Sequence, residues 1–144
     1  GWIVMHSGKS DSDSVAAYPN GVCADVQACF QHMKVACADA GIPKERLCFD
    51  IGIGFGKSND DNLALLRGLH ELKESDCALL TALSCKRVIA NTSGASGEDL
   101  LYGTIAADTL AIAAGTDFIR VHHVKEAKFA AKTADALTRG ESHG

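Results

Sequence analysis

The 144-residue sequence lacks any apolar run near the length of about 20 residues that a membrane-spanning helix requires. It also lacks a signal-peptide pattern, because residues 1 to 5 are typical of a core strand and not of a targeting segment. These absences predict a cytoplasmic protein with no membrane partner. The chain has no initiator Met and starts at Gly1, so we expect it to be a piece of a longer protein or a processed chain.

Basic residues are not in excess. Lys and Arg number 14 against 18 Asp and Glu, and the resulting net charge of −4 argues against a nucleic-acid partner, which would favour a basic face. The cysteines form no C-x-x-C pair and no zinc-finger spacing, so we expect small buried thiols in a reducing compartment and no disulfides. The six cysteines are Cys23, Cys29, Cys37, Cys48, Cys77 and Cys85.

The chain is too short for a closed barrel of eight strands and eight helices, which takes about 250 residues. It is long enough for one domain with a real core, and we expect a single domain over residues 1–144 without an internal linker.

Apolar strand patterns alternate with helical patterns along the chain. The predicted strands are Trp2–Met5, which we expect to be buried on both faces, Leu47–Phe49, Ala78–Leu83 and Phe118–Val121. The predicted helices are Val26–Cys37, one that starts at a Ser58–Asp61 capping box and carries Leu63, Leu66 and Leu69, Glu98–Ala114, and Lys125–Leu137. Residues 7–22 and Ala90–Gly97 are expected to be loops, and residues 138–144 a frayed tail. Strict alternation predicts an α/β fold with four parallel strands and right-handed crossovers.

The nine residues from Phe49 to Lys57 are the most informative segment. An apolar strand ends on Asp50, three glycines follow at every second position, and Lys57 closes the run. A strand that ends in a carboxylate and turns through glycines is typical of a ligand pocket in α/β proteins. A plain tight turn, with Asp50 capping it, is the alternative that these residues alone leave open.

Each of the other strands also ends in polar residues, and the carboxyl ends of parallel strands share one rim. His6 follows the first strand, Ser84 and Lys86 follow the third, and Arg120 and His122 belong to the fourth. Arg120 and His122 alternate, so we expect them on the same face. The sequence therefore predicts one polar site at this rim.

These segments resemble the dihydropteroate synthase family of pterin-binding transferases. Val4-Met5-His6 is similar to the end of its fifth strand, the Asp50–Lys57 run to its sixth strand and loop, Ser84-Cys85-Lys86 to the Ser-Arg-Lys of its seventh, and Arg120-Val121-His122 to the Arg-Val-His of its eighth. The resemblance covers Trp2 to about Leu137. It implies the C-terminal half, strands five to eight, of a (β/α)₈ TIM-type barrel.

The resemblance also implies roles for individual residues. Pterin would be bound by Asp50, Lys86 and Met5, pyrophosphate by Arg120 and His122, and the aromatic amine by Phe55, Lys57 and Ser84. Lys86, Arg120 and His122 would act in catalysis. Taken singly, Asp50 could be a turn cap and Lys86 a solvated surface lysine. The resemblance implies Mg²⁺ as cofactor, with its ligands in the N-terminal half that this chain lacks, and no metal ligand among the residues present.

Several positions depart from the family pattern. Ile51 stands where the family has proline, Cys85 replaces the arginine of Ser-Arg-Lys, and His123 replaces an aspartate. Ser7-Gly8-Lys9 replaces the family's Met-x-Gly, and the first four strands are absent. About half of the expected pocket is therefore present, and activity of this chain alone is not implied.

Two classes of function remain. One is a transferase fragment that joins 6-hydroxymethyl-dihydropterin pyrophosphate to 4-aminobenzoate in folate biosynthesis. A relative of the pterin-dependent methyltransferases is a closely related hypothesis. The other is a non-catalytic pterin-binding or interaction module. A transition-metal site of His6, Cys85, His122 and His123 is a weaker third idea. Because half a barrel exposes sheet edges and an apolar inner face, we expect self-association or docking onto an N-terminal half.

Overall fold

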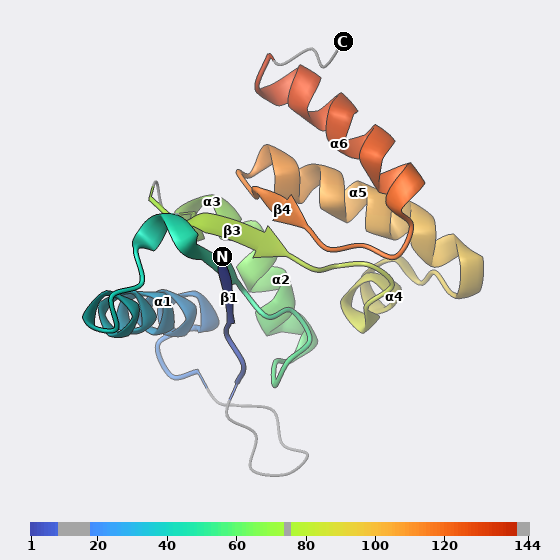
Figure 1. The fold of residues 1–144 in the computed structure, drawn as a ribbon. Helices are drawn as coiled ribbons and strands as arrows, with labels where there is room; N and C mark the ends of the chain where they lie inside the picture. The colour runs from blue at the N-terminus through green and yellow to red at the C-terminus, as the bar shows by residue number, and fades with distance from the viewer. Residues whose placement is uncertain (9–17, 74–75, 141–144) are drawn as a thin grey trace.

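The computed structural model describes residues 1–8, 18–73 and 76–140. Parts of the expected loop 7–22 and of the expected tail 138–144 lie outside these ranges. Four parallel strands form one sheet in the order β1-β2-β3-β4, which confirms the predicted α/β half-barrel topology (Figure 1). The strands are β1 (Trp2–Met5), β2 (Leu47–Asp50), β3 (Ala78–Thr81) and β4 (Phe118–Ile119).

Helices follow the strands as the alternation predicts. They are α1 (Val22–Asp39), α2 (Asn59–Arg67), α3 (Leu69–Leu72), α4 (Arg87–Ser93), α5 (Leu100–Ala113) and α6 (Val124–Thr138), with short 3₁₀ turns η1 (Lys44–Arg46) and η2 (Gly97–Asp99). The predicted capping box at the start of α2 is confirmed, since Ser58 accepts from the Asp61 backbone and Asp61 from the Ser58 backbone. Within the described ranges, no helix is both long and apolar enough to cross a membrane.

The hydrophobic core lies between the helices and the sheet face that they cover. Phe30 of α1 stacks on Phe49 of β2 with ring centroids 4.4 Å apart. Leu65 of α2 and Leu79 of β3 are buried in the same cluster. This packing fixes where each strand ends and so where the rim residues lie.

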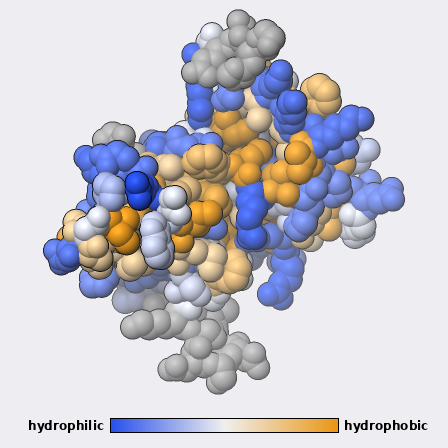
Figure 2. All heavy atoms as spheres, viewed as in Figure 1, coloured by the Kyte–Doolittle hydropathy of each residue, from blue (hydrophilic) through white to orange (hydrophobic). Residues whose placement is uncertain are grey.

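The other face of the sheet is open, and here the prediction for β1 was wrong. On this face Ile3 is 65% exposed and Phe118 56%, and Trp2, at the start of β1, is 60% exposed as well. An apolar run predicts that both faces of a strand are covered, but only the helix side of this sheet has a covering layer. Figure 2 shows apolar side chains gathered over the middle of the molecule, where Figure 1 places the strands. We call the exposed apolar side chains of this face, Ile3, Met5 and Phe118, the inner patch. Trp2 alternates with Ile3 along β1 and therefore points to the other side of this edge strand.

Several element boundaries also differ from the predictions. Residues 87–93 form α4 where a loop was expected from Ala90, because Val88 and Ile89 are buried and hold a helix that ends at Gly94. The leucine-rich helix breaks at Gly68 into α2 and α3. β4 stops at Ile119, so Arg120 and His122 follow the strand instead of belonging to it.

Candidate functional site

The loop after β2 is a tight glycine turn held against the end of β1. Gly52, Gly54 and Gly56 have φ of 65°, 84° and 64°, a region that side chains disfavour. A Cβ on Gly52 would lie 1.8 Å from the carbonyl oxygen of His6. The glycines are therefore required both by their backbone conformation and by close approach to β1.

Asp50 is buried at the end of β2, opposite Met5 in the sheet register. Its Oδ1 accepts a hydrogen bond of 2.8 Å from the backbone N–H of Gly52. The turn-capping role that the sequence left open is thus present. Burial lowers the pKa of both Lys57 and Lys86, and the negative charge of Asp50 opposes part of this shift.

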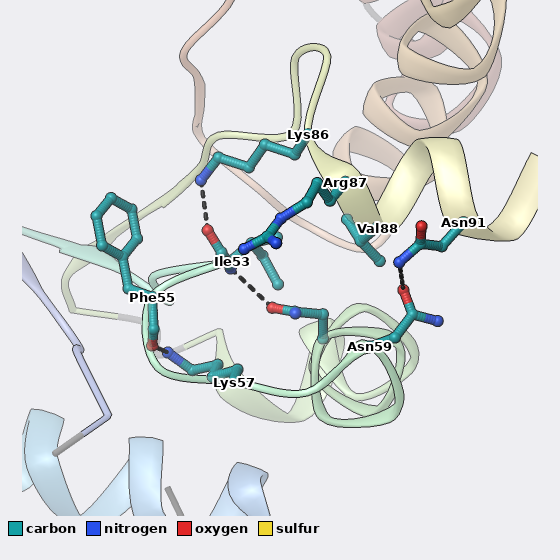
Figure 3. Close-up of a pocket in the computed structure, with 10 residues that line it drawn as sticks. Ile53, Phe55, Lys57, Asn59, Lys86, Arg87, Val88 and Asn91 are labelled. Carbon is teal, nitrogen blue, oxygen red and sulfur yellow. Dashed lines mark hydrogen bonds between the residues drawn. The ribbon is translucent and has the colours of Figure 1, made fainter. Parts of the chain in front are cut away.

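Lys86 points from the end of the β3 segment toward the glycine loop. Its ammonium group donates to the carbonyl of Ile53 and lies 5.0 Å from the ring centroid of Phe55, within range of a cation–π contact. Burial lowers the pKa of Lys86, Asp50 opposes this shift, and Arg120 adds to it. Figure 3 shows Lys86 and Phe55 side by side at one end of a cavity of about 390 Å³.

The same cavity extends between the glycine loop and α4. Its other lining residues are Gly54, Lys57, Asn59, Asn62, Arg87, Val88 and Asn91. Asn62 is buried, accepts from the backbone N–H of Gly54 at 2.8 Å and donates to the carbonyl of Ser58 at 2.7 Å. Asn62 was missed as a site residue, although an amide among the leucines of a helix is a signal that could have marked it.

A second cavity, of about 200 Å³, brings together the predicted residues that follow β3 and β4. It is lined by Ser84, Lys86, Arg120 and His122, with Ala82 and Val121. The hydroxyl of Ser84 lies 2.9 Å from Nδ1 of His122 and accepts from the His122 backbone N–H at 3.2 Å. We call Ser84, Lys86, Arg120 and His122 the anion cluster. The side chains of Lys86 and Arg120, an imidazole and a hydroxyl around one cavity, with no carboxylate in its lining, suit a phosphate group.

His6 takes no part in that cavity. Its Nε2 lies 2.8 Å from Oδ2 of Asp25 in α1, and burial lowers the pKa of its imidazole despite this contact. Among the residues that the structure describes, no group of three or more His, Cys, Asp or Glu side chains is placed to hold a metal ion. The proposed cluster of His6, Cys85, His122 and His123 therefore has no geometric support.

Cys85 occupies a strained position at the rim. It has φ of 55°, which is uncommon for a residue other than glycine, and its thiol is exposed. Its backbone N–H donates to Oγ1 of Thr104 in α5 at 3.1 Å. This contact fixes the turn that carries Ser84 and Lys86 on either side.

The family described as "Pterin binding enzyme" matches residues 1–122. The chain belongs to this family. It is similar to the dihydropteroate synthase of Escherichia coli strain K12, with 36% identity over 134 residues that cover 92% of this chain and 48% of that protein.

Solved structures of dihydropteroate synthases have the same fold over this part of their length. A Yersinia pestis enzyme in complex with a sulfonamide drug is 30% identical and gives a TM-score of 0.87 over 96% of this chain and 51% of its own. A Xanthomonas albilineans enzyme in complex with 7,8-dihydropteroate is 34% identical, with a TM-score of 0.84 over 94% and 49%. The chain thus spans about half the length of the relatives it matches.

Proposed function

We propose that this chain supplies the C-terminal half of an active site that condenses 6-hydroxymethyl-dihydropterin pyrophosphate with 4-aminobenzoate, a step of folate biosynthesis in the cytoplasm. The observation that carries the proposal is the anion cluster, in which Lys86, Arg120 and His122 line one cavity beside the buried carboxylate of Asp50. Membership of the pterin-binding family and the dihydropteroate bound to the similar Xanthomonas enzyme support the choice of substrate.

The reaction makes one bond and breaks one. The lone pair of the aromatic amine attacks the exocyclic methylene carbon, and a C–N bond forms while the C–O bond to pyrophosphate breaks. The bonding electrons leave on the pyrophosphate oxygen, and the new secondary amine releases a proton to water. Lys86, Arg120 and His122 stabilise the negative charge that grows on the leaving group.

The pterin and the amine would lie on either side of Lys86. Asp50 is suited to the N–C–N donor edge of a pterin, because two carboxylate oxygens match two parallel donors. Met5, opposite Asp50 in the sheet, offers apolar contact to the ring. Phe55, Ser84 and Lys57 are the predicted contacts of the amine, and Phe55 already presents its ring beside the Lys86 ammonium.

Magnesium would assist departure of the pyrophosphate in the family's reaction. Mg²⁺ prefers carboxylate and other oxygen ligands, yet the lining of the anion cluster contains cations, an imidazole and one hydroxyl. The described residues therefore do not fit a magnesium site by themselves. Its ligands would come from an N-terminal half.

Completion of the site requires a second half-barrel that packs against the inner patch. Apolar side chains at this density are poorly tolerated in water, and β1 and β4 are sheet edges whose backbone groups can pair with further strands. The occupant that the proposal needs is an N-terminal half-barrel. Association of two copies of this chain is the alternative outcome.

A non-catalytic pterin-binding or interaction module is the second candidate, and one observation favours it. Cys85 stands where the family has a cation, and its exposed side chain supplies no positive charge for an anionic substrate. A pterin-dependent methyltransferase relative is less consistent with the anion cluster, because methyl transfer has no pyrophosphate to release.

Calorimetric titration of this chain with the dihydropterin pyrophosphate and with inorganic pyrophosphate tests the proposal. We expect Arg120→Ala to weaken both ligands and Asp50→Ala to weaken only the pterin compound, with Arg46→Ala and Asp39→Ala as exposed controls. Binding of the pterin without turnover, even after an N-terminal half is added, would favour the module. Absence of binding from folded protein would overturn the proposal.

A further inference from the structure

Lys57 is buried, and its ammonium group is used entirely by the protein backbone. Nζ donates to the carbonyl of Gly52 at 2.8 Å, of Phe55 at 3.2 Å and of His6 at 3.3 Å. An ammonium group has three N–H donors, so none is left for a substrate. The contact to Phe55 is drawn in Figure 3.

The three carbonyls come from separate parts of the site. His6 follows β1 directly, Gly52 begins the glycine turn, and Phe55 stands at the tip of that turn. Two neutral contacts also hold the glycine turn, since Gly8 donates to the Phe55 carbonyl at 3.1 Å and the Tyr18 hydroxyl, from the segment before α1, to the Gly56 carbonyl at 3.2 Å. Lys57 is the charged group at the centre of this arrangement.

We infer that Lys57 is a positioning residue, which closes the glycine loop against the end of β1 and so sets the Phe55 ring beside the Lys86 ammonium. The part of this inference that concerns binding of the aromatic amine rests on the proposed function. In this inference Lys57 positions Phe55 and does not contact the amine directly, which replaces the contact predicted from the sequence. The three-way contact needs a compact ammonium on a flexible stem. The planar guanidinium of arginine cannot point three donors at three carbonyls around one atom.

The charges around Lys57 belong to every element that faces it. Asp50 of β2, Asp25 of α1 and Asp61 of α2 favour its charged form, while burial and Lys86 oppose it, and His6 lies near it at the end of β1. Burial is the largest effect and lowers the pKa of Lys57 to about 8. A neutral amine has two donors and a lone pair, so it repels one of the three carbonyls. The loop should therefore loosen as the pH rises through about 8.

The unsubstituted chain provides the first test. The ¹³Cε resonance of Lys57 and the amide resonances of Gly8, Gly54 and Phe55 should titrate together, with a midpoint near 8. In Lys57→Met the amide titration should be absent, and Lys57→Arg should not restore it. Lys128→Met, on the exposed side of α6, is the control and should leave the titration unchanged. A Lys57 midpoint above 10, or loop amides that do not follow it, would overturn the inference without need of a variant.

Ligand binding separates this inference from the proposed function. Inorganic pyrophosphate should bind Lys57→Met within about twofold of the unsubstituted chain, because Lys57 does not line the anion cluster. Binding of 4-aminobenzoate in the presence of pyrophosphate should weaken about tenfold in Lys57→Met and to a similar extent in Lys57→Arg. Full rescue by Lys57→Arg would indicate a simple charge contact to the amine's carboxylate and overturn the positioning role. If pyrophosphate fails to bind any form, the proposed function fails while the titration still tests Lys57.

Discussion

The hydroxyl of Ser84 holds both the ring and the backbone of His122, since its Oγ lies 2.9 Å from Nδ1 and accepts from the backbone N–H at 3.2 Å. The two residues are 38 positions apart in the chain and belong to the ends of different strands. A hydroxyl that donates to Nδ1 leaves the proton of a neutral imidazole on Nε2, the nitrogen free to meet a phosphate oxygen. Ser84 is thus placed to orient His122 and need not contact the amine.

Ser84→Ala should weaken the binding of inorganic pyrophosphate about fivefold, the equivalent of roughly 1 kcal/mol for one lost hydrogen bond. The imidazole would then rotate freely at the cavity. Calorimetric titration measures the effect, with Ser96→Ala on an exposed turn as the control. An unchanged affinity in Ser84→Ala, beside a loss in His122→Ala, would show that His122 needs no orienting partner.

Gly52→Ala should destabilise the fold far more than Gly94→Ala. Both glycines have positive φ, which costs an L-residue about 1–2 kcal/mol. A Cβ on Gly94 meets nothing within 4 Å, whereas one on Gly52 would lie 1.8 Å from the His6 carbonyl oxygen. Urea unfolding of the two variants separates the conformational cost from the clash. Equal losses would mean that β1 and the glycine loop are not held together in solution.

The strand ends could be predicted because each apolar strand pattern stops where polar residues begin. Parallel strands place their carboxyl ends at one rim, so Asp50, Lys86 and Arg120 could be assigned to one site from order alone. The side-chain directions could not be predicted. The Asp50–Lys57 motif specifies a lysine in the loop, but only the tight approach of the glycines to β1 turns that lysine inward onto backbone carbonyls.

The failures have physical causes of the same kind. The apolar pattern of β1 indicates that both faces of the strand are apolar. It does not indicate that one of these faces has no helix layer from the described part of this chain packed against it. α4 was missed because Asn91, Thr92 and Ser93 are weak helix formers, and burial of Val88 and Ile89 overrides that preference. In both places tertiary packing, or its absence, decided the outcome.

Asp108 should make the chain less stable as the pH rises from about 4 to about 6. This carboxylate of α5 is fully buried, and neither oxygen has a hydrogen-bond partner among the described residues. Burial raises its pKa from 3.8 to about 6. The folded chain therefore holds a proton that the unfolded chain releases, and stability is full below about pH 4 and falls by about 3 kcal/mol through pH 6.

Asp108→Asn removes this titration. The free energy of unfolding of the unsubstituted chain, minus that of Asp108→Asn, should fall between pH 4 and pH 6.5 in urea titrations. Asp39→Asn, exposed in the last turn of α1, is the matched control for the loss of one carboxylate. A difference that stays constant with pH would show that Asp108 is paired or hydrated in solution.

Association through the inner patch should be detectable in the fluorescence of one side chain, Trp2. Trp2 is the single tryptophan of the chain and is 60% exposed on the edge strand β1, beside Ile3 of the inner patch. When a second copy or an N-terminal half-barrel covers the open face and pairs with the edge strand β1, Trp2 leaves water and its fluorescence should shift to shorter wavelength. Phe118→Ser should weaken the association, because Phe118 belongs to the same face and is 56% exposed. Tyr102→Ser, 74% exposed on α5 among the helices, is the matched control.

Light scattering on the same samples gives the stoichiometry. The docking role of the inner patch would be contradicted by a monodisperse monomer whose Trp2 emission does not depend on concentration. The same monomer would also have to show no binding to an added N-terminal half.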